Sequence, residues 1–270
     1  SPTLRALIIP WAGLPDVTRE LALEFPHVAV HNLHHNAAAT AEMAMALLLA
    51  AAKCIVPIDR LFRQHDWTPR YQRAQSVLLA GKTALVLGYG QIGQRVARAC
   101  AALGMHVLAT RRSQPELELI EGVKVYPPHD LLALLPRSEV LIITLPLTPE
   151  TRGLIGEREL ALLPRGSIVV NVGRGSIIDE AALYHALRDR QLASAGLDVW
   201  YQYPADEAAR SSTPPAHYPF HELDNVVLSP HRAGDAIGNE AARLAALAAL
   251  LNAATRGEDM PNRVAVSIGY

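Results

Sequence analysis

The chain has 270 residues, of which half are hydrophobic and 19% are charged, and its formal net charge is −1. This length allows two domains with sizeable cores, and this balance excludes a disordered chain. The near-zero charge gives no sign of a nucleic-acid partner. The longest apolar run, between Met43 and Ala52, is too short to span a membrane.

The only two cysteines, Cys54 and Cys100, are too few for a disulfide framework, which is typical of a reducing compartment. The first residues lack the shape of a signal peptide. His31, His34 and His35 have no cysteine or acid nearby with metal-ligand spacing, so we expect a solvated loop and no metal. A soluble, cytoplasmic protein is therefore expected.

The first 75 residues predict short strands, helices and a polar connector. Residues 7–9 are apolar and are followed by Pro10, which is typical of a buried strand that leads into a turn. Residues 36–53 are rich in Ala, Leu and Met, which predicts a helix buried on nearly all sides. The other elements expected here are a helix at 16–24, a strand at 28–30, a helix at 58–64 and a connector at 66–76.

From Lys82 onward the sequence alternates apolar strands with helices. Residues 83–87 form an apolar strand of the kind whose two faces are both covered, and a helix at 91–103 follows it. Further strands are expected at 107–109, 123–125, 140–144, 168–171, 195–199 and 226–228. This alternation indicates an α/β fold with a doubly wound parallel sheet.

The last residues are similar in texture to the first ones. An Ala/Leu-rich helix is expected at 239–254 and a last strand at 264–268. We therefore expect two domains, one of them discontinuous. Residues 1–75 and 235–270 would form one domain, and residues 76–234 would form the other.

The turn after strand 83–87 has the spacing of a dinucleotide-binding loop. Its residues are Gly88, Tyr89, Gly90, Gln91, Ile92 and Gly93. The three glycines permit a tight turn, a close approach of a pyrophosphate and close packing of helix against strand. Because the turn follows a strand and opens a helix, its context is the one that the motif requires. We expect a nicotinamide dinucleotide here.

The end of the next strand predicts which dinucleotide is bound. An NAD site places an acid there, whereas this chain has Thr110, Arg111 and Arg112 and no acid before Glu116. Two guanidinium groups suit a 2′-phosphate. The sequence therefore predicts NADP(H), with NAD(H) as the less favoured cofactor.

Polar side chains follow three strands of the second half of the sheet. Arg174 comes shortly after strand 168–171, Asp198 lies at the end of the next strand, and His231 follows the last one. The carboxyl ends of parallel strands form the ligand-binding edge of such a sheet. An arginine there can hold a carboxylate, and a histidine can exchange a proton at neutral pH.

At these residues the chain resembles the D-2-hydroxyacid dehydrogenases. The matching stretches run in the family's order from about Lys82 to Gly234. They are Gly88–Gly93, Leu145–Thr151, Asn171–Gly175 with Asp179, Gly196–Val199 and Pro230–Gly234. The resemblance implies a Rossmann cofactor domain and a smaller flavodoxin-like substrate domain. It also implies a homodimer formed through the cofactor domain.

The resemblance also implies roles for single residues. Arg174 would bind the carboxylate and carbonyl of a small 2-keto acid, and His231 would be the general acid/base. Asp198 would hold the nicotinamide carboxamide. The backbone of Trp11, Ala12 and Gly13 would receive the substrate carboxylate. The remaining cofactor-lining residues would be Thr40, Leu145, Pro146, Thr151, Val172, Gly173 and Gly234.

One position departs from the family pattern. The family has a Glu before a Pro here, which raises the pKa of the histidine, whereas this chain has Tyr203 before Pro204. A phenol stays neutral near pH 7 and cannot stabilise an imidazolium as a carboxylate does. Three interpretations are open. Tyr203 positions His231, an acid of the following insertion (Asp206, Glu207 or Glu222) replaces the Glu, or ordinary turnover is lost.

A second departure is at the start, which lacks most of the strand, helix and strand that the family has before the segment at 4–13. Two interpretations are open: the sequence is a fragment of a longer chain, or the substrate domain is shortened. The leading hypothesis is an NADP(H)-preferring oxidoreductase that interconverts a small 2-keto acid and its D-2-hydroxy acid. The alternatives are a dinucleotide-sensing binding protein of the corepressor type and formate-dehydrogenase-like chemistry. Retention of both Arg174 and His231 favours the enzyme.

Overall fold

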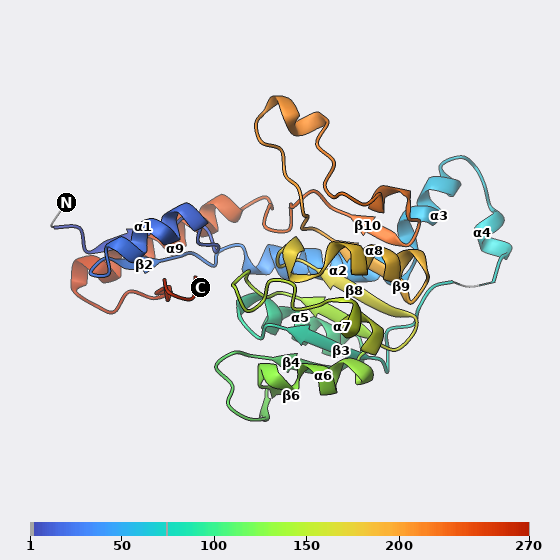
Figure 1. The fold of residues 1–270 in the computed structure, drawn as a ribbon, viewed down its shortest axis with the longest axis horizontal. Helices are drawn as coiled ribbons and strands as arrows, with labels where there is room; N and C mark the ends of the chain where they lie inside the picture. Colours follow the sequence, from blue (N-terminus) through green and yellow to red (C-terminus); the bar gives the residue numbers. More distant parts are fainter. Residues whose placement is uncertain (1–2, 74, 270) are drawn as a thin grey trace. The chain divides into compact units, whose positions relative to one another are not determined.

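The computed structural model describes residues 3–73 and 75–269, and its contacts divide the chain into two compact units (Figure 1). The first unit holds the chain up to Thr40, the short segment Thr148–Glu150, and everything from Gly234 onward. The second unit holds Ala41–Leu147 and Thr151–Ala233.

The first unit is built around a small parallel sheet. Strand β1 (Ala6–Ile8) pairs with β2 (Ala29–His31), and helix α1 (Asp16–Glu24) connects them; α9 (Asn239–Arg256) belongs to the same unit. The C-terminal segment joins this core because the Val264 amide donates to the Val30 carbonyl at 2.8 Å. The strand expected at 264–268 is wrong, since this segment makes one isolated bridge, Arg263 to His31, and then turns.

His31 also differs from expectation. Its side chain is buried in β2, and its Nδ1 lies 2.8 Å from the Pro261 carbonyl oxygen. A solvated loop is therefore the wrong interpretation at this position, because the C-terminal segment covers it.

The second unit contains an eight-stranded sheet with the order β10-β9-β8-β7-β3-β4-β6-β5. Seven strands are parallel, and only β5 at the edge runs antiparallel to its neighbour β6. The strands are β3 (Thr83–Leu87), β4 (His106–Thr110), β5 (Glu118–Ile120), β6 (Val123–Tyr126), β7 (Val140–Ile143), β8 (Ser167–Asn171), β9 (Leu192–Leu197) and β10 (Val226–Leu228). The chain winds from β3 in one direction and from β7 in the other, which confirms the doubly wound α/β fold.

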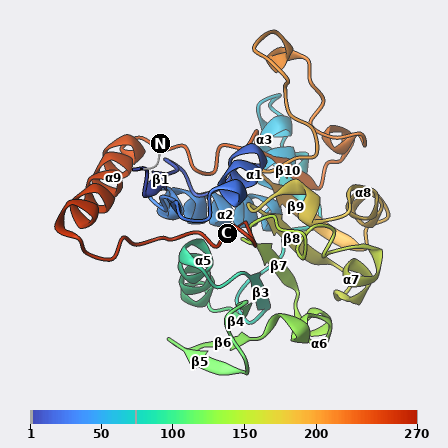
Figure 2. The same ribbon diagram turned by 60° about the vertical axis from the view of Figure 1, so that its left-hand side comes forward.

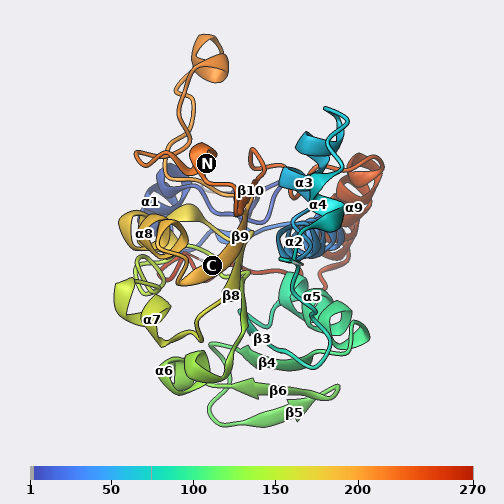
Figure 3. The same ribbon diagram turned by 90° about the vertical axis from the view of Figure 1, so that its right-hand side faces the viewer.

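Helices cover both faces of this sheet (Figure 3). Helices α2 (Ala37–Ala52) and α5 (Gln91–Ala102) lie on one side, and α6 (Leu131–Leu134), α7 (Glu157–Leu162) and α8 (Glu180–Arg188) lie on the other. Single turns of 3-10 helix occur at Pro128–Asp130, Leu135–Arg137, Gly175–Ile177, Ala208–Ser211 and Phe220–Glu222. Because the central strands β3, β7 and β8 are buried on both faces, the sheet divides the core into two buried layers.

The compact units divide the chain differently from the expected domains. Residues 41–73 group with the large sheet, whereas the sequence placed them in the first domain. Helix α2 explains the difference, because it packs so closely on β9 that a Cβ on Gly196 would lie 2.7 Å from the Leu47 Cβ. Helices α3 (Ile55–Phe62) and α4 (Thr68–Tyr71) then follow in the same unit.

Within the described ranges, none of the helices is by itself long and apolar enough to cross a membrane. Only α2 and α3 together meet the length and composition test, as a pair bent by 65°.

The sequence did not predict the form of two segments of the second unit. Figure 2 shows β5 and β6 as a hairpin at the edge of the sheet, joined by Glu121 and Gly122, which have φ values of 50° and 81°. The insertion after β9 forms an arm, residues 203–214, that projects from this unit (orange in Figure 1). The base of the arm is closed where the Tyr201 and Gln202 amides donate to the Pro215 carbonyl.

Candidate active site

The glycine-rich turn lies at the carboxyl end of β3, between β4 and β7. The amides of Gly88 and Tyr89 donate to the Thr110 carbonyl at 3.2 and 2.8 Å, which ties the turn to the end of β4. On the other side, the Thr144 hydroxyl donates to the Gly88 carbonyl at 2.8 Å. The turn is therefore held from both neighbouring strands.

The three glycines have separable roles. Gly88 has a φ of 100°, a conformation that other residues rarely adopt. A Cβ on Gly93 would lie 1.9 Å from the Gly88 carbonyl oxygen, so no side chain fits there. A Cβ on Gly90 would meet nothing within 4 Å, so this backbone is open to a ligand. Gln91 and Ile92 then form the first turn of α5, whose N–H groups lack acceptors within the helix and suit an anion. The turn fits a dinucleotide pyrophosphate.

The end of β4 carries the two arginines of the predicted 2′-phosphate site. Thr110 is buried, whereas the Arg111 and Arg112 side chains are exposed. The Arg111 amide donates to the Tyr126 carbonyl at 3.0 Å, so β6 fixes its backbone. Among the described residues neither arginine takes part in an ion pair. Two free guanidinium groups thus follow the strand that supports the glycine turn.

Tyr89 lies inside the protein instead of facing a ligand. Its side chain is 1% exposed, and its hydroxyl has no hydrogen-bond partner among the described residues. Burial raises the pKa of this phenol, and Glu121 adds to the effect. The contribution of Tyr89 to the site is therefore its backbone and its packing under the turn.

The predicted residues that follow β7 and β8 contact the turn and one another. A Cβ on Gly88 would touch Leu145, and a Cβ on Gly173 would lie 2.6 Å from the Leu145 carbonyl oxygen. Val172 is buried beside this contact, and Pro146 follows Leu145 with partial exposure. The Thr151 hydroxyl donates to the Pro146 carbonyl at 2.7 Å. Thr151 thus shapes the segment that ends β7.

Arg174 lies in a short loop after β8 that Asn171 organises. The Asn171 side chain accepts from the Gly173 amide and donates to the Arg174 carbonyl, both at 3.0 Å. The Arg174 guanidinium donates to the Gly173 carbonyl at 2.7 Å and has no described acidic partner. The free nitrogens of this guanidinium are available for a carboxylate.

Asp198 is fully buried and holds the turn that carries His231. Its carboxylate accepts hydrogen bonds from the Ser229 hydroxyl and from the amides of Arg232 and Ala233, the last two at 2.9 Å. His231 lies between these donors in the left-handed region, with a φ of 57°. The structure therefore gives Asp198 a clear part in fixing the backbone around His231, in addition to the predicted role toward the cofactor.

Tyr203 lies against His231 at the base of the arm. The ring centroids are 5.4 Å apart with an interplanar angle of 55°. The Tyr203 hydroxyl accepts from the Trp200 amide at 3.1 Å, while its ring lies against the imidazole. Burial lowers the pKa of His231 and the Arg174 charge lowers it further, while Asp198 acts in the opposite direction.

The three acids considered as replacements for the missing Glu have other partners. Asp206 caps the 3-10 turn by accepting from the Ala209 amide at 2.9 Å, and Glu207 pairs with Arg210 at 2.8 Å. Glu222 is exposed beside His221. The charged groups that influence His231 are Arg174 and Asp198. Each of these three acids thus has a described partner other than His231.

Five other predicted site residues belong to the first unit. Trp11 is half exposed, and its carbonyl accepts from the Leu33 amide, while the Ala12 carbonyl accepts from the Asn32 side chain. Gly13 ends this turn. Thr40 is buried and donates to the Asn36 carbonyl at 2.9 Å. Gly234 is also close to Asn36, since a Cβ on Gly234 would lie 2.7 Å from the side-chain amide nitrogen of Asn36.

Sequence reasoning missed residues that hold the site from behind. Thr144 and Asn171 anchor the glycine turn and the Arg174 loop, and Trp200 donates from its indole to the Ser229 carbonyl at 2.8 Å. Thr144 and Asn171 were visible as polar residues that end apolar strands. Nothing local in the sequence marks Trp200, because its partner is 29 residues away.

Comparison with known proteins places the chain in a family. Residues 45–233 match the family model described as D-isomer specific 2-hydroxyacid dehydrogenase, NAD binding domain. The chain is 37% identical over 98% of its length to a glyoxylate reductase of Aeropyrum pernix, and it covers 77% of that protein. It is 32% identical over 93% of its length to a D-3-phosphoglycerate dehydrogenase of Methanocaldococcus jannaschii, of which it spans 46%.

Solved structures agree with the sequence matches. A D-isomer specific 2-hydroxyacid dehydrogenase from Xanthobacter autotrophicus, in complex with NADPH and MES, superposes with a TM-score of 0.80 at 31% identity, over 100% of this chain and 80% of the other. An NADPH-dependent glyoxylate/hydroxypyruvate reductase from Sinorhizobium meliloti, in complex with NADP and sulfate, has a TM-score of 0.80 at 26% identity, with coverages of 100% and 81%. These matches show that the chain belongs to the D-isomer specific 2-hydroxyacid dehydrogenase family.

Proposed function

We propose that the chain catalyses the reversible, nicotinamide-dependent reduction of a small 2-keto acid to its D-2-hydroxy acid. The observation that supports this most is the arrangement of Arg174 and His231. They follow β8 and β10 at the carboxyl edge of the sheet that carries the glycine turn, and the Arg174 charge lowers the pKa of His231. Membership of the family supports the same reaction class.

In this proposal each residue has one task. Arg174 binds the substrate carboxylate through its free nitrogens and polarises the carbonyl. When bound, the nicotinamide supplies the hydride to the carbonyl carbon in reduction and accepts it in oxidation. His231 as imidazolium donates a proton to the carbonyl oxygen, and as neutral imidazole it takes the proton back from the hydroxyl group. Asp198 keeps the turn of His231 in place.

For Tyr203 we propose a positioning role. Its ring contacts the imidazole and its hydroxyl is anchored on the Trp200 amide, so it limits the orientations of His231 without adding charge. In this proposal Tyr203 orients His231, as the Glu of the family does, but it does not raise the pKa of His231. That pKa is then determined by burial and by Arg174 and Asp198.

We propose NADP(H) as the preferred cofactor, with NAD(H) used less well. Arg111 and Arg112 are exposed, have no described acidic partner and follow the strand end that meets the adenosine ribose in this fold. The solved relatives from Xanthobacter and Sinorhizobium hold NADPH and NADP, which supports the preference. Measured KM values for NADPH and NADH decide it, and a lower KM for NADH would contradict it.

The test of the reaction itself is a spectrophotometric screen. We expect NADPH oxidation with at least one of glyoxylate, hydroxypyruvate and pyruvate. Tight NADPH binding measured by fluorescence, with no oxidation by any 2-keto acid, would instead favour the alternative of a dinucleotide-sensing binding protein. Tyr203, which is neutral where the family has an acid, is the feature that keeps this alternative in the test.

We further propose a homodimer formed through the large-sheet unit. Helices α3 and α4 expose an apolar surface on which Ile55, Phe62, Trp67 and Tyr71 are 54%, 51%, 57% and 82% exposed. Such a surface is typical of an interface that another subunit covers. Trp67→Glu should shift the mass measured by light scattering to that of a monomer, while Leu119→Glu, which changes an exposed residue on β5, should not.

The proposed compartment is the cytoplasm. Both cysteines are free thiols, and burial raises the pKa of Cys100 to about 12, which keeps it unreactive.

A further inference from the structure

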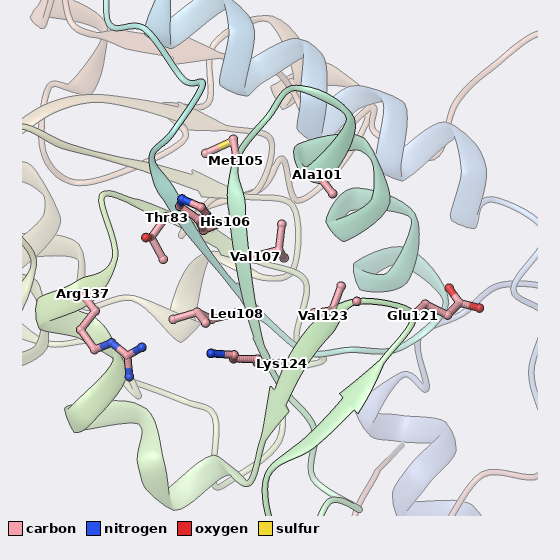
Figure 4. Close-up of a pocket in the computed structure, with 11 residues that line it drawn as sticks. Thr83, Ala101, Met105, His106, Val107, Leu108, Glu121, Val123, Lys124 and Arg137 are labelled. Carbon is pink, nitrogen blue, oxygen red and sulfur yellow. The ribbon is translucent and has the colours of Figure 1, made fainter.

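A cavity lies at the edge of the large sheet opposite to the glycine turn. It has a volume of about 450 Å³ and is bounded by the amino ends of β3, β4 and β6 (Figure 4). Thr83 and His106 begin β3 and β4, whereas Gly88 and Arg111 follow the other ends of these strands. The cavity and the proposed cofactor site therefore lie at opposite ends of strands β3 and β4.

Strand register places four of the lining side chains on one face. Thr83 pairs with His106, and Leu108 pairs with Lys124, and alternate residues of a strand point to the same side. Thr83, His106, Leu108 and Lys124 thus share the face on which Leu108 joins the buried layer under α6. Arg137, in the 3-10 turn after α6, completes this side of the cavity. The result is an apolar floor with polar and basic groups around it.

The two cations of this cavity are directed into the same space. Figure 4 shows the charged ends of Lys124 and Arg137 pointing toward each other beside Leu108, with Glu121 at the far end of the cavity. Both side chains are exposed, and in residues 3–73 and 75–269 neither has an ion pair. The nearby Glu139 is already used, because it pairs with Lys82 at 2.7 Å and accepts from the Thr83 amide.

Two like charges that converge beside Leu108, with the acid Glu121 at the other end of the cavity, favour an anion between them. A guanidinium binds a phosphate through two parallel hydrogen bonds, and an ammonium adds a point charge. The cavity volume is in the range of small-molecule sites, so it has room for an organic group beside the anion. Leu108, which shares a face with Lys124, offers that group an apolar surface.

We propose that this cavity binds a small organic phosphate, with the phosphate between Lys124 and Arg137 and the apolar body over Leu108. The site is independent of the proposed reaction, since none of its side chains belongs to the proposed active site. An organic phosphate would therefore bind while the cofactor site is filled. Its affinity would fall with rising salt, because both cations are exposed.

Phenyl phosphate is a suitable probe, with benzyl alcohol as the uncharged comparison. Both are titrated calorimetrically into the full chain saturated with NADPH. We expect binding of phenyl phosphate and none of benzyl alcohol. Lys124→Ala and Arg137→Ala should each weaken binding about ten-fold or more, since each removes a charged contact. Arg158→Ala, which removes an exposed arginine of α7, should leave it unchanged.

The outcomes separate this site from the others. The absence of binding to the unchanged protein would overturn the proposal. Equal affinity of the Lys124→Ala/Arg137→Ala double variant would also overturn it, because the probe would then occupy another site such as that of Arg174. An unchanged KM for NADPH and an unchanged melting temperature show that the variants are folded, so a loss of binding then supports the proposal.

Discussion

The aromatic ring of Tyr203 packs on the imidazole of His231, with centroids 5.4 Å apart, while its hydroxyl group is bound to the Trp200 amide. The histidine is thereby held by a neutral group. Burial lowers its pKa below the ordinary 6.5, and Arg174 adds to this. Because reduction needs the imidazolium, kcat/KM for a 2-keto acid should fall as pH rises through this lowered pKa. Oxidation needs the neutral ring and should show the opposite limb.

Replacement of Tyr203 by Glu should move both limbs to higher pH. A carboxylate beside the imidazole stabilises the imidazolium and so raises the pKa of His231. The measurement is kcat/KM against pH in both directions. Tyr203→Phe is the matched control, because it keeps the ring and removes only the hydroxyl group, and its pH profile should stay close to that of the unchanged enzyme. A profile that Tyr203→Glu does not move would show that the ring is not beside the catalytic histidine during turnover.

The two arginines after β4 should determine the cofactor. Arg111→Ser/Arg112→Ser removes the charged contacts available to a 2′-phosphate, each worth roughly 1.5–3 kcal/mol. We expect the KM for NADPH to rise by about ten-fold or more while that for NADH changes little. Arg158→Ser serves as a control for the loss of a surface charge. Equal effects on the two cofactors would mean that the arginines lie outside the 2′-phosphate site.

Two glycines of the same turn should respond differently to alanine. In Gly93→Ala the Cβ would overlap the Gly88 carbonyl oxygen, so the turn must shift, at a cost of about 1–3 kcal/mol in the free energy of unfolding. In Gly90→Ala the Cβ meets nothing in the protein, so stability should be nearly unchanged while NADPH binding weakens. Urea denaturation and NADPH titration separate the two effects. Unimpaired NADPH binding by Gly90→Ala would place the pyrophosphate elsewhere.

Asp198 should matter for both stability and turnover. Asp198→Asn leaves one acceptor oxygen for the donors that the carboxylate now serves, so at least one buried donor loses its partner. We expect a loss of about 1–3 kcal/mol in the free energy of unfolding and a fall in kcat as the His231 turn loosens. Ser229→Ala removes one donor and keeps the acceptors, so it should cost less. A wild-type kcat in Asp198→Asn would show that this turn needs no anchor.

Local patterns predicted the sheet and the glycine turn because both depend on residues that are adjacent in the sequence. Strands 83–87 and 226–228 were placed at their observed bounds, since an apolar run between turn residues marks a buried strand. The hairpin of β5 and β6 was half missed, because β5 is a three-residue edge strand that is mostly exposed. The helix after Lys53 begins before Pro57, since proline is tolerated in the first turn.

The contacts that position the candidate residues could not be predicted in the same way. Asp198 serves donors 31 to 35 residues away, and the partner of Tyr203 depends on how the arm folds back at its base. The residue types were visible in the sequence, but their hydrogen-bond partners are determined by the packing of separate strands. The strand expected at 264–268 fails for a related reason, because the chain end turns after one bridge to His31.

The arm has a consequence for proteolysis. Its residues are mostly exposed. It lies in the connection from β9 to β10, which pair with each other at one edge of the sheet. Exposed loop tips are the preferred sites of nicking. A protease should therefore cut near Ala208–Ser211 and leave two fragments that stay associated under native conditions and separate only in denaturant. Tyr203 begins the arm. The activity of the nicked protein, compared with that of the intact protein, would therefore show whether His231 needs an unbroken arm beside it.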